Sequence, residues 1–76
     1  MKHLQYAVII EKAGDGSYSA YVPDLPGCVT CGCDTLDAVQ RSIREAIEFH
    51  LEGLREDGNP IPQPTSSVAM IGVDAA

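Results

Sequence analysis

Alternating apolar and polar side chains mark two segments in the first third of the chain. Residues 4–12 read LQYAVIIEK and place Tyr6, Val8 and Ile10 on one side of an extended chain. Residues 17–22 read SYSAYV and alternate in the same way, and both segments are rich in the β-branched and aromatic residues that favour strands. The AGDG sequence between them suits a tight turn, so the pattern predicts a β-hairpin.

A helical spacing replaces this alternation after residue 34. Asp34 and Thr35 are both good N-caps, and no proline follows them until the DGNP sequence at residues 57–60, which would end a helix. The apolar positions between these points recur at steps of three and four, so they form one stripe that we expect to face a sheet. They are Leu36, Val39, Ile43, Ala46, Ile47, His50, Leu51 and Leu54.

The PDLPG sequence at residues 23–27 lies between the hairpin and the helix. Its prolines lack amide donors and disfavour helix in the residues before them, and Gly27 permits a reversal of the chain. We therefore expect an ordered loop that leads into a short third strand over residues 28–33. This structural loop motif comprises Pro23, Asp24, Leu25, Pro26 and Gly27.

A last apolar segment, residues 67–73, follows the extended PIPQP sequence and predicts one more strand. The expected element order is β-β-β-α-β. We predict a single α+β domain over residues 1–76, with the helix packed on one face of a small sheet.

A domain of 76 residues buries only a small core, and domains of this size commonly gain stability from a partner subunit. One helix leaves the second sheet face and at least one sheet edge open, with Ala7, Ile9 and the tyrosines available to line that face. We therefore expect a homodimer or a homotetramer.

Charge and hydropathy narrow the class of partner. Eleven acidic and five basic residues give a net charge of −6, which repels nucleic-acid phosphates and favours a basic protein partner. No apolar run of about 18 residues is present to span a membrane, and residues 1–5 have no signal-peptide character. We expect a cytoplasmic protein that binds neither nucleic acid nor membrane directly.

An acidic row on the predicted helix is the candidate contact surface for such a partner. Glu45, Glu48 and Glu52 follow one another at steps of three and four. Most rows of this kind are simply solvated helix faces. The alternative is that the row meets arginines of a basic partner.

Three cysteines within six positions, CVTCGC, raise the question of a metal or redox centre. They supply at most three soft ligands, and no fourth ligand is near them in sequence. In a regular strand Cys31 and Cys33 would share one face and Cys28 the other, although a bulge at Gly32 would change this parity. We interpret them as small, partly buried side chains and expect no metal and no cofactor.

No constellation of catalytic residues is evident either. His50 lies on the apolar stripe without a nucleophile beside it, and the carboxylates outside the helix are scattered along the chain. We do not expect an enzyme. The alternatives that stay open are an orphan oligomer of the same fold that binds a small ligand or a metal, and a remnant nuclease.

Four segments together resemble the HicB family of antitoxins. They are YSAYVPDLPGC at residues 18–28, DTL at 34–36, RSIREAIEFHLEGL at 41–54 and EDGNPIPQP at 56–64. The resemblance implies a partial ribonuclease H-like fold without nuclease activity. It also implies the neutralising role in a type II toxin-antitoxin pair, in which the domain covers a small basic HicA-like toxin that cleaves messenger RNA.

The chain departs from the family pattern at two places. Many members carry an additional C-terminal DNA-binding domain, and the few residues after the last proline predict that this one does not. Cys28 fits the pattern, but Gly32 is followed by both Cys33 and Asp34, so this segment has one extra residue.

Overall fold

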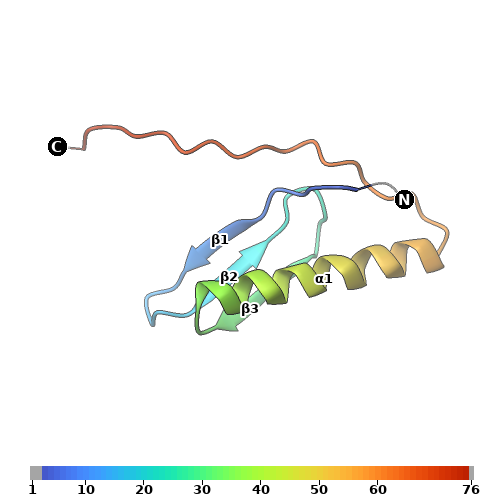
Figure 1. The fold of residues 1–76 in the computed structure, drawn as a ribbon, viewed down its shortest axis with the longest axis horizontal. Helices are drawn as coiled ribbons and strands as arrows, with labels where there is room; N and C mark the ends of the chain where they lie inside the picture. Colours follow the sequence, from blue (N-terminus) through green and yellow to red (C-terminus); the bar gives the residue numbers. More distant parts are fainter. Residues whose placement is uncertain (1–2, 76) are drawn as a thin grey trace.

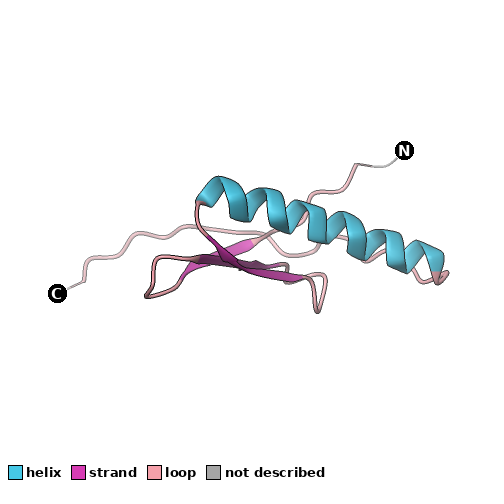
Figure 2. Cartoon of the chain, turned by 90° about the horizontal axis from the view of Figure 1, so that it is seen from below, coloured by secondary structure: helices cyan, strands magenta, loops and turns pink. Residues whose placement is uncertain are grey.

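Three short strands and one long helix form two layers in the computed structural model, which describes residues 3–75 (Figures 1 and 2). The strands form one antiparallel sheet in the order β1-β2-β3, and the helix covers one of its faces. The described residues exclude Met1, Lys2 and Ala76. The first two belong to the N-terminal segment in which no signal peptide was expected. The elements are β1 (Ile9–Lys12), β2 (Tyr18–Tyr21), β3 (Val29–Cys33) and α1 (Leu36–Glu56).

The predicted hairpin is confirmed, with a shorter first strand than the sequence pattern indicated. Ile10 lies opposite Ala20, and the turn closes with a 2.8 Å hydrogen bond from the Ala13 amide to the Ser17 carbonyl. β1 begins at Ile9 because β2 ends at Tyr21, the residue paired with Ile9. Residues 3–8 pair with no strand in the described part of the chain.

A β-bulge interrupts β3. Tyr18 pairs with Cys33 and Ala20 pairs with Thr30, so two residues of β3, Cys31 and Gly32, lie opposite one residue of β2. Gly32 has a φ of 73°, which a residue with a side chain rarely adopts. The bulge thus accommodates one residue of β3 that has no counterpart opposite it on β2.

The bulge also determines the orientation of the cysteines. Cys28 is buried in the core and Cys33 packs against the core, whereas Cys31 is exposed. The strand is therefore not regular, and the alternative of a bulge at Gly32, which changes this parity, is confirmed. All three are free thiols.

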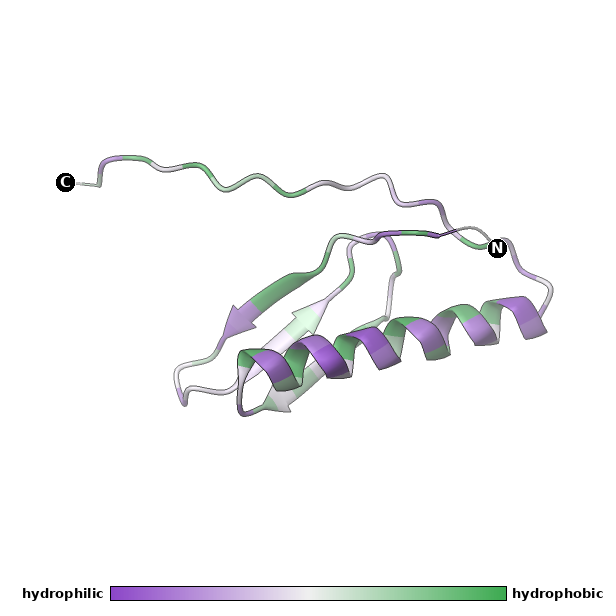
Figure 3. Ribbon diagram, viewed as in Figure 1, coloured by the Kyte–Doolittle hydropathy of each residue, from purple (hydrophilic) through white to green (hydrophobic). Residues whose placement is uncertain are grey.

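The helix is confirmed with the predicted start. Thr35 is the N-cap, and its hydroxyl accepts a 3.0 Å hydrogen bond from the Ala38 amide. At the other end, amides of Asp57 and Asn59 donate to carbonyls of the last turn. Hydrophilic residues follow the outer side of α1 (Figure 3). Among residues 3–75, no helix is long and apolar enough to cross a membrane.

The core lies between α1 and the sheet and is small, as expected for this chain length. α1 packs mainly on β3 and β2, and the Thr30 and Ser42 hydroxyls join it to β3 by a 2.5 Å hydrogen bond. The helix is therefore displaced toward the β3 edge. The buried hydrophobic residues of the core are Ala20, Val22, Leu25, Cys28, Val39 and Ile43.

The last predicted strand is not formed. Residues 67–73 are extended, as their composition indicated, but they pair with no other segment among the described residues. A strand requires a neighbouring backbone, and the chain after α1 runs past the outer side of β1 and away from the sheet (Figure 1). The observed order is β-β-β-α followed by an extended segment, which we call the tail (residues 67–73).

Leu25 allows a test of this core, since its side chain is 0% exposed. We expect Leu25→Ala to lower the free energy of unfolding by about 2–5 kcal/mol, because the cavity adds to the lost burial. Urea denaturation followed by circular dichroism measures the change. Leu36→Ala is the control, since the exposed Leu36 should cost much less; equal losses would contradict the assigned core.

Candidate partner-binding site

The PDLPG loop consists of two consecutive tight turns. The Val22 carbonyl accepts from the Leu25 amide at 3.1 Å, and the Leu25 carbonyl accepts from the Cys28 amide at 3.0 Å. Each turn has a proline at its second position, where the fixed φ of proline is favourable. Gly27 has a φ of 85°, as the third position of a type II turn requires.

Asp24, the exposed acid of this loop, binds a segment 41 residues away in sequence. Its carboxylate accepts hydrogen bonds from the amide and hydroxyl of Thr65 at 3.0 Å each, and from the amide and hydroxyl of Ser66 at 3.0 and 2.9 Å. Nearby, the Tyr6 hydroxyl donates to the Pro62 carbonyl at 2.6 Å. We call these five bonds the clamp, because they fix the chain where the tail begins.

The clamp alters the acidity of both side chains that form it. The hydrogen bonds from Ser66 and Thr65 favour the ionised carboxylate and lower the pKa of Asp24 below its usual 3.8. Burial and the nearby charge of Asp24 raise the pKa of Tyr6, while Arg55 opposes this shift. Around neutral pH the clamp therefore contains a carboxylate acceptor and a protonated phenol donor.

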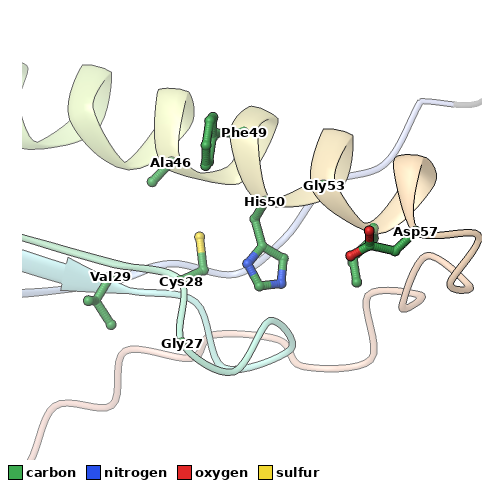
Figure 4. Close-up of a pocket in the computed structure, with 9 residues that line it drawn as sticks. Gly27, Cys28, Val29, Ala46, Phe49, His50, Gly53 and Asp57 are labelled. Carbon is green, nitrogen blue, oxygen red and sulfur yellow. The ribbon is translucent and has the colours of Figure 1, made fainter.

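A groove of about 480 Å³ lies between the beginning of β3 and the second half of α1 (Figure 4). The loop side contributes Gly27, Cys28 and Val29, and the sulfur of Cys28 points toward the helix. Phe49 at the rim of the groove is 79% exposed, whereas the side chain of Val29 points away from the helix (Figure 4). The helix side contributes Ala46, Phe49, His50, Gly53, Leu54 and Asp57.

The chemistry of the groove favours binding over catalysis. Burial raises the pKa of the Cys28 thiol, which keeps it protonated and weakly nucleophilic even though His50 lines the same groove. Among the described residues, no hydrogen bond joins these two side chains. Within residues 3–75, no group of three or more His, Cys, Asp or Glu side chains is placed to hold a metal ion.

The three glutamates of the predicted toxin-binding row are exposed on the side of α1 away from the core. The surface around them is mixed in charge, since Glu48 and Glu52 share a shallow hollow with Arg55. Arginines also lie one turn before Glu45 and Glu48 on the helix. The row is therefore available to a partner, but arginines border it at both ends.

Two features escaped the sequence analysis. The exposure of Phe49 could have been predicted from the sequence, because this aromatic residue lies outside the apolar stripe of an amphipathic helix. The contact between Asp24 and Thr65 had none, since nothing in the spacing of the chain relates two residues so far apart.

Comparison with known proteins places this architecture in a described family. A family profile described as "HicB_like antitoxin of bacterial toxin-antitoxin system" matches residues 6–74. The chain is 47% identical over 58 residues to an uncharacterized 14.9 kDa protein of Haemophilus phage HP1. This alignment covers 76% of the present chain but only 42% of the phage protein. The chain is also 41% identical to a UPF0150 protein of Synechocystis, over 76% of this chain and 72% of the relative. A UPF0150 protein of Archaeoglobus fulgidus is 44% identical over 72% of this chain and 81% of its own.

The clamp predicts a local effect of Asp24→Ala. Loss of the acceptor should increase hydrogen exchange at the Thr65 and Ser66 amides and leave the Ser17 amide unchanged. Asp15→Ala is the matched control, because Asp15 is an exposed carboxylate that binds Ser17 and also has a lowered pKa. Asp15→Ala should increase exchange at the Ser17 amide and leave the Thr65 and Ser66 amides unchanged. If either variant changed exchange at all three amides, the two carboxylates would not act locally.

The same contact predicts a pH dependence. A depressed pKa means that the clamp is complete above the usual value of 3.8 and is lost as the pH falls through the lower pKa of the folded state. The NMR amide shifts of Thr65 and Ser66 should therefore titrate with a midpoint below 3.8. A midpoint at or above that value would contradict the clamp.

Proposed function

The chain belongs to the family of HicB-like antitoxins of bacterial toxin-antitoxin systems, and on this basis we propose that it neutralises a small, basic, HicA-like toxin that cleaves messenger RNA. In this proposal the domain is a binding module without catalytic activity, and it acts by covering the toxin surface. Its target places it in the cytoplasm. The ribonuclease H-like relationship belongs to the same proposal and is supported by the three antiparallel strands followed by a helix on one face.

The observation that carries the proposal is the family match over residues 6–74, and the charge of the chain agrees with it. A net charge of −6 attracts a basic protein and speeds encounter, while opposite charges in contact fix the orientation of the complex. Binding rather than chemistry is also consistent with the protonated Cys28 in the groove.

Glu45, Glu48 and Glu52 are the proposed contacts with the toxin. They are exposed, they lie on a rigid helix, and they are absent from the core, so a partner can pair with them without disturbing the fold. Arginines border the row, with Arg41 and Arg44 before it and Arg55 after it. This arrangement favours a toxin with individually placed Arg or Lys side chains over one that presents a uniform basic surface.

Self-association, expected from the sequence, is also part of the proposed function. The outer face of the sheet carries a row of apolar side chains from all three strands, because Ile9 pairs with Tyr21 and Tyr21 pairs with Val29. Tyr21 is exposed, and so is Val29. A homodimer or homotetramer would cover such apolar surface.

Replacement of all three glutamates by lysine tests the toxin contact. We expect the association rate with the basic protein encoded beside this chain to fall at least about tenfold at low salt, and its salt dependence to flatten. Surface plasmon resonance at several salt concentrations measures both quantities. Thermal melts should show nearly unchanged folding, since these positions are outside the core.

The matched control replaces Glu11, Asp34 and Asp74 by lysine. All three are exposed, and both triple variants change the net charge from −6 to zero, so they differ only in where the charge is reversed. The control should keep most of the association rate. Equal losses in the two variants would show attraction by net charge alone, and unchanged kinetics in the glutamate variant would remove α1 from the interface.

The neutralising role itself is tested by co-expression. If the neighbouring basic protein arrests growth and degrades messenger RNA, this chain should relieve both effects, and the glutamate variant should relieve them less. Relief of neither effect by the unaltered chain would contradict the proposed function.

A further inference from the structure

The large apolar side chains that remain exposed are concentrated in two places. One is the tail, where Met70 is 93% exposed and Ile71 is 81% exposed. The other is the groove between β3 and α1, where Phe49 is 79% exposed. Among residues 3–75, five of the eight exposed large hydrophobic residues belong to these two surfaces, which is more than scattered exposure explains. They are Phe49, Val68, Met70, Ile71 and Val73.

The start of the tail is held in a defined direction. The PIPQP sequence before it has a proline at every second position, which makes it a stiff, extended spacer. The clamp then binds its end through Asp24 and Tyr6, so the chain leaves the domain from a fixed point. The tail itself projects past the sheet and extends the molecule to 50 Å along its longest axis (Figure 1).

The tail cannot fill the groove of its own chain. It leaves on the outer side of β1, whereas the groove lies at β3, and the strand order places these two strands at opposite edges of the sheet. Figures 1 and 2 agree on this separation. An occupant of the groove must therefore come from another molecule.

The chemistry of the tail suits the groove. Residues 67–73, SSVAMIGV with the preceding serine, contain no charged side chain, and the groove is lined mainly by apolar groups. β3 pairs only with β2 among the described strands, so its outer backbone groups are free to bond an added strand. The backbone of the tail is extended and equally unpaired within the described chain.

We propose that residues 67–73 of one copy add as a strand to the β3 edge of a second copy and place their apolar side chains in its groove. The prolines and the clamp present the tail, and the open edge of β3 receives it. Exchange in both directions gives a two-fold dimer, and exchange in one direction around a ring gives a larger closed assembly. The inference deepens the self-association in the proposed function, but it does not depend on a toxin.

Light scattering coupled to size exclusion tests the exchange on the protein alone. The unaltered chain should be a dimer or a larger closed oligomer at micromolar concentration. Ile71→Asp alters the tail and Phe49→Asp alters the groove, and each should yield monomers. Leu36→Asp is the control, because Leu36 is also an exposed apolar residue but lies outside both surfaces, and it should remain oligomeric.

Crosslinking identifies where the tail binds. A photoreactive amino acid in place of Met70, in a mixture of isotopically light and heavy chains, should crosslink light to heavy chains at Phe49 or Gly53. Crosslinks within one chain to β1 would overturn the proposal, because the tail would then complete its own sheet. A monomeric unaltered chain, or oligomers that persist in both aspartate variants, would overturn it as well.

These readouts are separable from the proposed function. They use no toxin, so a failure of toxin binding leaves them unchanged. Conversely, loss of the exchange in Ile71→Asp leaves Glu45, Glu48 and Glu52 in place, and toxin binding by that monomer can be measured directly. Circular dichroism melts of each variant confirm that the domain remains folded.

Discussion

The burial of Leu25 is the contact on which the rest of the structure depends. The two proline-initiated turns exist as a pair because this side chain is held in the core between them. Its position orients Asp24 outward toward the tail on one side and Cys28 inward beneath the helix on the other. One buried side chain in a loop thus determines the direction of the tail, the floor of the groove and the entry into β3.

A core of six buried residues leaves much of the surface to be completed by other molecules. The chain has two kinds of surface that a partner could cover, one charged and one apolar. Charged side chains occupy the outer side of α1, where a basic toxin is proposed to bind, and apolar side chains occupy the groove and the tail, where a second copy is proposed to bind. Because the surfaces differ in chemistry, each suits a different class of partner.

The comparison of sequence and structure is most informative at β3. Alternation predicted a strand over this segment, and a strand is present, but the faces of its cysteines follow the alternative with a bulge at Gly32 and not the regular strand. A single residue reverses which side chains face the core beyond it. Alternation therefore predicts the existence of a strand more securely than the faces of its residues.

The segment after the helix shows the second limit. Residues 67–73 have the composition of a strand, and their backbone is extended, but no strand is formed within the described chain. Composition reports what a backbone can adopt. Whether it pairs depends on where the clamp directs it, and the clamp joins residues 41 positions apart.

The sequence by itself determined the hairpin, the helix and its cap, the acidic surface and the family, because each rests on local periodicity, capping chemistry or a motif of adjacent residues. Only the tertiary structure decided the bulge, the groove beside Phe49 and the departure of the tail past β1. These features arise from contacts between residues distant in the chain. Such contacts depend on how the helix and the sheet pack around a shared core, and local sequence patterns do not predict this packing.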